Sequence, residues 1–309
     1  MAQVQFGLRV PPGNYELPQQ EFLKRIRAAL DMVVGHFDSV WLPDHLQFGA
    51  GPFLEGWTML SYLAGAQPEL KYGHLVICQL FRNPALLAKM AATFQYMCQG
   101  NFIFGIGAGW AEEEARAYHL PFPPPGQRVS ELEEQLQIIN ALWREENVTF
   151  EGKYHQVTNA YCVPRPDPLP PVLIPSFQPR MMRITARYAD WWNSGIEGIK
   201  DLDKAKGLLK ALDEACEKEG RDPKTLRRTA MIGIYCAPTE QKVKELTATH
   251  KGPFGLGFVG TPTQVVEQLQ AYVELGFDYF MVLPGAMMRD FTTLEMLTHE
   301  VLPALNKGN

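Results

Sequence analysis

The chain has 309 residues, of which 46% are hydrophobic and 20% charged, with a formal net charge of −5. This composition is that of a globular protein with a sizeable core, and the lack of a long basic run argues against a nucleic-acid partner. Five scattered cysteines without a C-x-x-C pair argue against a disulfide framework or a zinc site. No segment is long and apolar enough to span a membrane, so we expect a cytoplasmic protein.

Strand-like and helix-like segments alternate from one end of the chain to the other. Apolar runs predict strands at 4–10, 38–43, 72–78, 102–107, 172–175, 191–194, 228–236 and 279–283. Helical spacing predicts helices at 19–34, 56–65, 86–97, 129–143, 181–189, 201–219, 262–275 and 291–305. Repeated strand–helix units predict a parallel sheet, and eight of them predict one α/β domain, a closed (β/α)8 TIM barrel over residues 1–309. An open doubly wound sheet is the alternative.

The longest irregular stretch runs from about 145 to 171. It contains VTFEGKYHQV, which alternates like a strand, and the proline-rich run PRPDPLPP. Long loops in compact domains often serve a function, so we expect this insertion to lie over the C-terminal face of the barrel, at its mouth.

The strand predicted at 38–43 is followed by Asp44 and His45, an adjacent titratable pair at a strand end. Chemistry in (β/α)8 barrels takes place at these ends. A histidine changes protonation near neutral pH, and a neighbouring carboxylate can tune it. The sequence is equally compatible with a structural role, in which Asp44 caps the following loop and His45 packs or faces solvent.

The strand at 102–107 leads into a glycine-rich turn with Gly105, Gly107 and Gly109, followed by Trp110. Missing β-carbons allow either a flat cofactor ring or a neighbouring segment to approach the backbone closely. The glutamates at 112–114 repel anions and therefore disfavour a phosphate loop here.

Longer motifs follow one another in a fixed order. They are WLPDHL (41–46), FRNPALLAKMAATF (81–94), GIGAGWAEEEARAYHLPFP (105–123), RVSELEEQLQIINALW (128–143), VTFEGKYH (148–155), ARYADWWN (186–193) and VGTPTQVVEQLQAY (259–272). This ordered set resembles the luciferase-like monooxygenase superfamily of TIM barrels and is most similar to its coenzyme F420-dependent oxidoreductases. The resemblance covers essentially the whole chain. It implies hydride transfer between F420 and a small organic substrate, with an FMN-dependent monooxygenase as the alternative.

The resemblance also implies where the cofactor lies. Asp44 and His45 would lie beside the redox ring, with His45 as proton donor or acceptor or as the residue that orients the substrate. A non-proline cis peptide at Leu75–Val76 would form a bulge behind the ring. Gly107, Gly109 and Trp110 would form the turn beside the cofactor, although Trp110 fits a core aromatic equally well. Because superfamily members are commonly dimeric, a homodimer is the expected assembly.

The turn after the strand at 172–175 departs from the family pattern. Family members usually hold the cofactor phosphate there with backbone N–H groups of a glycine-rich turn at a helix N-terminus. This chain has Pro175-Ser-Phe-Gln-Pro179-Arg180 instead, where the prolines lack an N–H and Phe177 adds bulk. Ser176, Gln178 and Arg180 remain as side-chain donors, so we expect the phosphate near them and weak binding. A barrel that has lost its cofactor and binds a ligand or partner is a further alternative.

Other residues give weaker signals. We assign none of the dispersed histidines to a metal, and we expect His74, in the third strand, to face the barrel interior. The aromatic residues near strand ends indicate either an apolar pocket mouth or core packing; they are Trp41, Phe48, Phe53, Trp57, Trp110 and Phe177.

Overall fold

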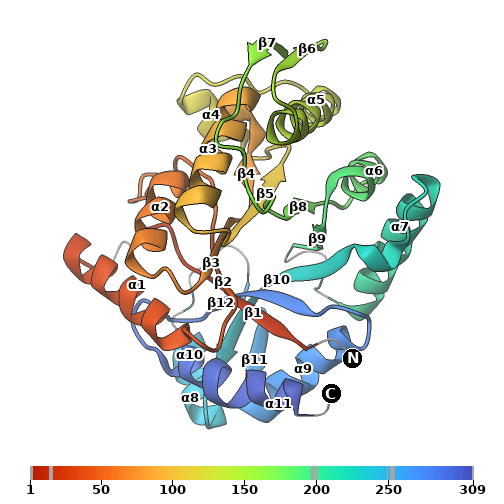
Figure 1. Cartoon of the computed structure of the whole chain (residues 1–309). Helices are drawn as coiled ribbons and strands as arrows, with labels where there is room; N and C mark the ends of the chain where they lie inside the picture. The colour runs from red at the N-terminus through yellow and green to blue at the C-terminus, as the bar shows by residue number, and fades with distance from the viewer. Residues whose placement is uncertain are drawn as a thin grey trace.

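The computed structural model of the chain describes residues 3–13, 17–195, 199, 201–248, 250 and 255–307. Within these residues, eight parallel strands close into a ring (Figure 1). They are β1 (Gln5–Arg9), β2 (Ser39–Leu42), β3 (Lys71–His74), β5 (Phe102–Gly107), β8 (Val172–Pro175), β9 (Trp191–Asn193), β10 (Arg227–Cys236) and β12 (Tyr279–Pro284). Each strand pairs with the next in this order, and β12 pairs back with β1. The predicted (β/α)8 barrel is therefore confirmed, and the open sheet is excluded.

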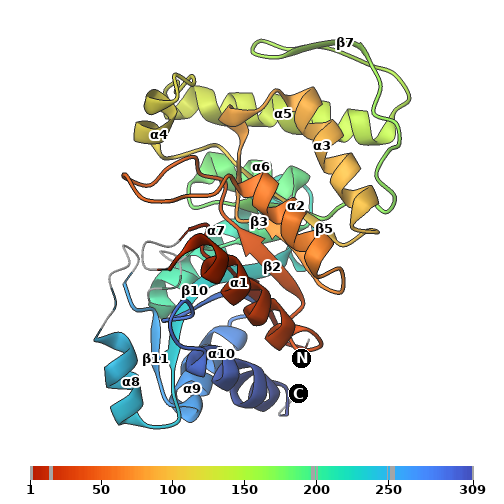
Figure 2. The same cartoon turned by 90° about the vertical axis from the view of Figure 1, so that its left-hand side faces the viewer.

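Helices surround this ring on the outside (Figures 1 and 2). The main ones are α1 (Gln19–Val33), α2 (Gly56–Ala66), α3 (Pro84–Met97), α5 (Pro125–Arg144), α6 (Pro179–Tyr188), α7 (Leu202–Lys218) and α9 (Pro262–Val273). The C-terminal run consists of α10 (Thr292–Met296), a π-helical turn (Leu297–Val301) and α11 (Leu302–Asn306). In the described part of the chain, no helix is both long and apolar enough to cross a bilayer.

Among the α-helices and strands that the structure describes, three short ones are absent from the sequence prediction. They are α4 (Glu112–Ala117), α8 (Glu240–Thr247) and strand β11 (Phe258–Gly260), which pairs with the end of β10. Each is too short to show a periodic pattern. Helix α3 begins at Pro84, two residues before the predicted start, because a cap is present. The side chain of Asn83 accepts the N–H groups of Ala85 and Leu86 at the start of α3.

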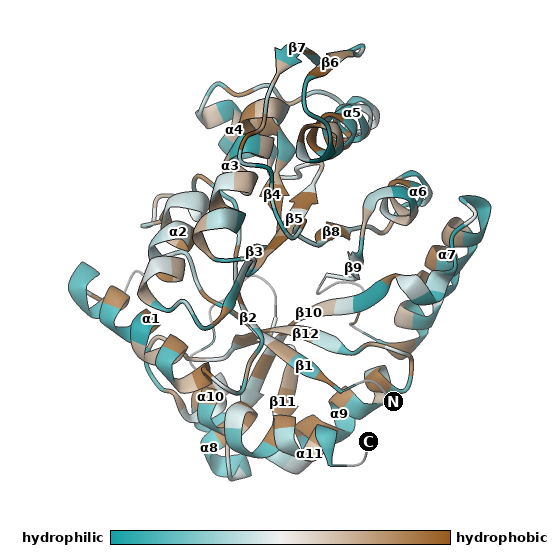
Figure 3. Cartoon of the chain, viewed as in Figure 1, coloured by the Kyte–Doolittle hydropathy of each residue, from teal (hydrophilic) through white to brown (hydrophobic). Residues whose placement is uncertain are grey.

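Alternation along β1 shows how the barrel is packed. Phe6 and Leu8 point outward into the main core beneath the helices. Gly7 points inward, because a Cβ placed there would collide with the indole of Trp41. A separate cluster fills the interior of the barrel and consists of Trp41, Ile103, Leu173, Tyr279 and Met281. Figure 3 shows the corresponding pattern, in which β5 and β8 are hydrophobic whereas α1 and α7 alternate between hydrophobic and hydrophilic residues. Trp41 is thus core packing.

The segment near 145–171 forms a hairpin of two antiparallel strands, β6 (Val148–Glu151) and β7 (Gln156–Ala160). Glu134, in α5, holds the turn of this hairpin, because its carboxylate accepts the backbone N–H groups of residues 153–155. Figure 2 shows the hairpin outside α5, on the flank of the barrel. The expectation that this segment covers the mouth is therefore corrected.

Candidate active site

A cavity of about 210 Å³ opens at the carboxyl ends of the strands. Most residues that we predicted for the site line it, namely Asp44, His45, Leu75, Val76, Gly109, Trp110 and Phe177. The cavity is further lined by Cys78, Glu114, Asn193 and Met231. Its position at the strand ends is where chemistry takes place in (β/α)8 barrels.

A larger hollow of about 880 Å³ lies on the flank, between α5 and α6. Its charged lining residues are already engaged. Arg187 pairs with Glu133 and Glu219, and Arg221 donates to backbone carbonyls. It offers no group poised for chemistry, so the cavity at the mouth is the better candidate. Among the described residues, no group of three or more His, Cys, Asp or Glu side chains is arranged to hold a metal ion.

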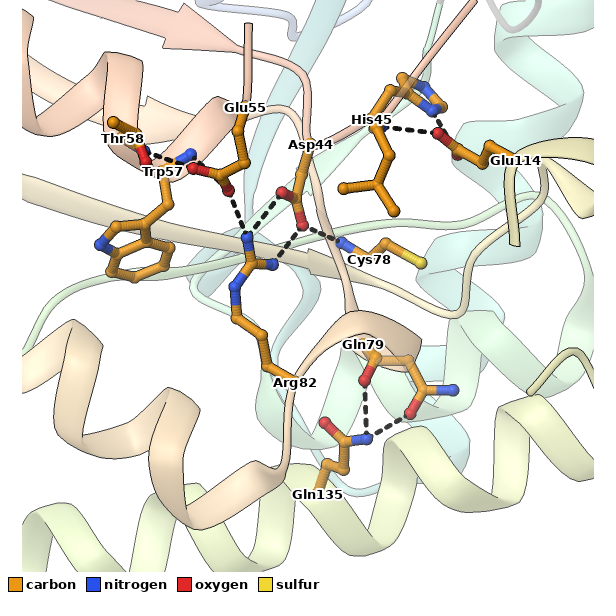
Figure 4. A network of polar contacts seen from close by, with 11 residues as sticks. Asp44, His45, Glu55, Trp57, Thr58, Cys78, Gln79, Arg82, Glu114 and Gln135 are labelled. Atoms are coloured by element: carbon orange, nitrogen blue, oxygen red, sulfur yellow. Dashed lines mark hydrogen bonds and ion pairs between the residues drawn. The ribbon is translucent and has the colours of Figure 1, made fainter. Parts of the chain in front are cut away.

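Asp44 fixes the architecture of the mouth and does not contact His45 through its carboxylate. Asp44 is only 3% exposed. Its carboxylate accepts two hydrogen bonds from Arg82, at 2.6 and 3.0 Å (Figure 4). It also accepts the backbone N–H of Cys78 at 2.9 Å. Arg82 reaches onward to Glu55 at 2.8 Å, and Glu55 caps the start of α2. A bidentate ion pair of this kind holds its partners in one geometry.

His45 is paired with a different carboxylate, that of Glu114. Its Nδ1 lies 2.6 Å from Oε1 of Glu114, and the other oxygen of Glu114 accepts the backbone N–H of Leu46 at 2.8 Å (Figure 4). Glu114 belongs to α4 and is buried. The neutral imidazole that donates from Nδ1 keeps Nε2 as an acceptor, and the protonated ring donates from both nitrogens. The carboxylate expected beside His45 is therefore Glu114 and not its sequence neighbour Asp44.

Aromatic rings enclose His45 on several sides. The ring centroids of Phe48, Phe53 and Trp110 lie 5.5, 6.1 and 5.2 Å from that of His45. Trp110 is 63% exposed, so the core alternative for this residue is excluded. These side chains give His45 an apolar, partly shielded environment at the edge of the cavity.

The chain forms a bulge behind the cavity, and the peptide bond between Leu75 and Val76 is cis, as the resemblance implies. The chain leaves β3 at His74 and pairs again with β5 as a short strand, β4 (Ile77–Cys78). The glycines of β5 make room for this bulge. A Cβ at Gly105 would collide with the carbonyl oxygen of His74, and one at Gly107 would lie 2.9 Å from Val76. At these two glycines a neighbouring segment approaches the backbone closely, and the role of Gly107 beside the cofactor stays a prediction.

His74 points outward to α2 and not into the barrel interior. Its ring stacks on Trp57 at a centroid distance of 5.2 Å. The side chain is fully buried, and neither ring nitrogen has a hydrogen-bond partner among the described residues. Burial lowers the pKa of His74 to about 4, although the charge of Asp44 acts in the opposite direction. His74 is therefore a neutral packing residue at physiological pH.

The turn after β8 is arranged differently from the expectation. The Ser176 hydroxyl is buried and accepts a hydrogen bond from Thr185 at 3.0 Å. Arg180 donates to the carbonyl of Gly126 and to Ser130, both in α5. Gln178 is the N-cap of α6 and forms no side-chain cap hydrogen bond. The first N–H groups of α6 are therefore not capped by a side chain, whereas Ser176 and Arg180 are engaged within the protein.

Comparison with known proteins identifies the family. Residues 26–252 match the family described as luciferase-like monooxygenase. The chain belongs to the luciferase-like monooxygenase family. An F420-dependent glucose-6-phosphate dehydrogenase from Microbacterium testaceum is 30% identical over 307 residues, which cover 88% of this chain and 90% of that protein. A phthiodiolone/phenolphthiodiolone dimycocerosates ketoreductase from Mycobacterium kansasii is 29% identical and covers 76% of this chain and 78% of that protein.

Solved structures share the luciferase-like barrel. An F420-dependent secondary alcohol dehydrogenase with an F420-acetone adduct has a TM-score of 0.82 at 19% identity, over 98% of this chain and 99% of that chain. The FMN-bound oxygenating component of 3,6-diketocamphane monooxygenase from Pseudomonas putida has a TM-score of 0.78 at 19% identity, over the same fractions. At these identities the likeness establishes the fold.

Sequence reasoning missed Glu114 and Arg82 in this luciferase-like site. The sequence presents Glu114 only as one of a run of acidic residues and Arg82 only as part of a family motif. One signal was available, since both residues follow predicted strand ends, where side chains converge on the mouth of a barrel. Nothing in the sequence distinguishes Glu114, which is buried, from the exposed Glu113 next to it.

Proposed function

We propose that this luciferase-like barrel is an oxidoreductase that transfers a hydride between coenzyme F420 and a small organic substrate. The observation that carries the proposal is the cavity at the mouth, with apolar Leu75 and Val76 in its wall and the His45–Glu114 pair at its edge. Such an arrangement offers a redox ring a surface to lie on and a proton carrier beside it. The F420-dependent dehydrogenases among the relatives support F420 as the cofactor.

The residues of the cavity fit a deazaflavin. Leu75, Val76 and Met231 would support the ring, because they line the cavity and pack on the cluster that fills the barrel. The uncapped N-terminus of α6 suits an anionic phosphate, with Gln178 and Arg180 beside it. Phe177 lines the cavity here, and its ring packs against Gly195. We therefore expect weaker binding than a glycine-rich turn would give. F420, when bound, supplies the hydride chemistry.

His45 moves the proton in this proposal. Glu114 holds Nδ1, and Nε2 has no hydrogen-bond partner among the described residues. Neutral Nε2 accepts the proton of an alcohol as it is oxidised, and protonated Nε2 donates to a carbonyl oxygen as it is reduced. Asp44 is a positioning residue, because its carboxylate joins the loop after β2 to Arg82 and Cys78.

An FMN-dependent monooxygenase is the second candidate. It is favoured by the barrel shared with the FMN-bound 3,6-diketocamphane monooxygenase component. A barrel that has lost its cofactor is the third, and the Phe177 ring in the cavity is the observation that favours it. The three candidates differ in which flavin, if any, the protein binds.

A pair of binding titrations tests the proposal. Protein expressed without either cofactor is titrated with F420 and with FMN, and flavin fluorescence reports binding. We expect saturable binding of F420, tighter than that of FMN. A preference for FMN would favour the monooxygenase, and binding of neither would favour the cofactor-free barrel. Bleaching of F420 absorbance by glucose 6-phosphate or by a secondary alcohol, the substrates named for relatives, then tests turnover.

We also propose that the protein forms a homodimer and is located in the cytoplasm. Large apolar side chains are exposed at the end of α3, where Tyr96 is 71% and Met97 68% exposed, and exposed apolar surface often marks an interface. All five cysteines are free thiols, as suits a reducing compartment. Light scattering at the outlet of a sizing column measures the assembly, and a single chain mass would contradict the dimer.

A further inference from the structure

Charged side chains in and beside the cavity are largely paired with one another. Asp44 and Glu55 share Arg82, and Glu114 binds His45. Arg9, the last residue of β1, differs from them. It forms no hydrogen bond or ion pair with any residue that the structure describes, and its Nε is buried without a partner.

Arg9 faces the interior of the barrel. Residues alternate along a strand, and Phe6, Leu8 and Val10 belong to the outer core, so Gly7 and Arg9 point inward. Gly7 backs onto Trp41, and Arg9 is the next inward position toward the mouth. Trp41 belongs to the cluster that fills the interior, and Leu75, Val76 and Met231, which pack on that cluster, line the cavity. Arg9 therefore faces the same interior as the cavity.

Arg9 lies on β1, on a side of the barrel that contributes no described residue to the cavity wall. The wall includes residues that follow or belong to β2, β3 with β4, β5, β8, β9 and β10, and none from β1 or β12 among the described residues. β1 pairs with β2, the strand that leads to His45. The loops after these two strands also touch, since the N–H of Leu54 donates to the carbonyl of Pro12.

A desolvated guanidinium without a counter-ion is unfavourable until an anion joins it. Burial lowers the pKa of Arg9 to about 10, and no carboxylate contributes to the shift. The group still carries its charge at neutral pH. An anion in the mouth would therefore find a cation that has already lost much of its water and has no competing partner among the described residues.

We propose that Arg9 binds an anionic group of the substrate, a carboxylate or a phosphate, at the β1 side of the mouth. The planar guanidinium fork matches two oxygens of either group. This deepens the proposed function and rests on it for the statement that the ligand is the substrate of the redox reaction. Held there, the substrate extends toward His45 at the end of the adjacent strand.

Calorimetric titration with inorganic phosphate, pyruvate and pyruvamide tests the proposal. Pyruvate and pyruvamide have nearly the same shape and differ in charge. Wild type should bind phosphate and pyruvate, and Arg9→Met should weaken both roughly 10- to 100-fold, the loss of one charge-assisted contact. Pyruvamide should bind both proteins equally. Arg116→Met is the matched control, because Arg116 is exposed on α4 and paired with Glu112.

Thermal unfolding shows whether Arg9→Met folds. The substitution removes a charge that is unpaired and partly buried, and it leaves no counter-charge unpaired in the protein. The Tm of Arg9→Met should therefore equal or exceed that of wild type. Arg9→Lys keeps the charge and should recover part of the affinity. The proposal is overturned if wild type binds neither anion, or if Arg9→Met binds both as tightly as wild type does. F420 is titrated into the same proteins. Arg9-dependent anion binding without F420 binding would reject the proposed function alone, and the reverse result would reject the anion site alone.

Discussion

Glu114 determines how His45 is presented to the cavity. One of its oxygens binds Nδ1 of His45, and the other binds the backbone N–H of Leu46. The ring and the loop that carries it are therefore held by one buried carboxylate. An imidazole fixed in this way has a defined orientation and a defined nitrogen for proton exchange, as acid–base catalysis requires.

His45→Ala should lower kcat by roughly 10²- to 10⁴-fold, the usual contribution of a general acid–base group. The F420 dissociation constant should change little, because the ring is supported mainly by the apolar wall. Steady-state kinetics and a fluorescence titration measure the two effects. The exposed His36 provides the control substitution, His36→Ala. Unchanged turnover across the pH range would remove His45 from the mechanism.

Glu114→Gln should lower kcat by about tenfold or more, since it replaces a charge-assisted hydrogen bond worth roughly 1.5 kcal/mol or more by a neutral one. It should also displace the pH dependence of kcat, which a purely structural role would not do. Glu113→Gln, at an exposed position on the same helix, is the matched control. If both variants show the wild-type pH profile, Glu114 does not act on His45.

Among the elements, the bulge between β3 and β4 and the glycines of β5 form one packed unit. The carbonyl of His74 lies where a side chain at Gly105 would begin, and backbone atoms yield less easily than side chains. The turn before α6 is a second such element, because it brings Phe177 into the cavity beside the helix terminus.

Gly105→Ala should destabilise the protein by about 1–3 kcal/mol, the range found for overpacked cores, or should prevent folding. Urea unfolding measures the change. Gly126→Ala is the control, because a Cβ there, in the first turn of α5, would meet nothing within 4 Å. Equal stability of wild type and Gly105→Ala would show that the bulge can move away from β5.

Phe177→Gly should tighten F420 binding, because it clears space at the terminus of α6 and restores backbone freedom to the turn. Arg180→Ala should weaken it by removing a positive charge from the same end of the helix. Fluorescence titration of F420 measures both constants. If neither substitution moves the dissociation constant, the cofactor phosphate binds elsewhere.

The sequence predicts the long elements well because their apolar residues repeat with a clear period. Helix α4 and strand β4 are too short for that signal, so the sequence predicts the third strand as one piece over 72–78, whereas the structure divides it into β3 and β4. Sequence order also predicts many of the residues that reach the mouth, but not which of them pair. Asp44 and His45 are neighbours along the chain, yet Arg82 and Glu114 reach them from other strand ends. Such pairings depend on the closure of the barrel and on side-chain rotamers.

For the molecule as a whole, His74 makes stability depend on pH. Its pKa of about 4 in the folded protein is below the ordinary value of 6.5, because burial disfavours the charged ring. Between these values the unfolded chain binds more protons, so acidification favours unfolding. The contribution of His74 is fully present above pH 6.5 and is lost as the pH falls toward 4.

His74→Phe should remove this part of the pH dependence, which amounts to roughly 3 kcal/mol, while retaining the stack on Trp57. Urea unfolding between pH 7 and pH 4 measures the free energy of unfolding of wild type and of His74→Phe. Protonation of carboxylates affects both proteins equally, so the difference between the two curves reports on His74. Parallel curves would show that His74 is protonated in the folded protein as readily as in the unfolded chain.

Because Trp110 is exposed, its intrinsic fluorescence can report on the mouth of the barrel. The chain has six tryptophans, and Trp110 is exposed whereas the others, such as Trp41 and Trp192, are buried or half-buried. Emission from an indole in water is shifted to longer wavelength, and iodide reaches it by collision. The iodide-quenchable, red-shifted component of emission therefore reports on the mouth of the barrel. A molecule that enters beside His45 would shield this component and leave the light of the interior tryptophans unchanged.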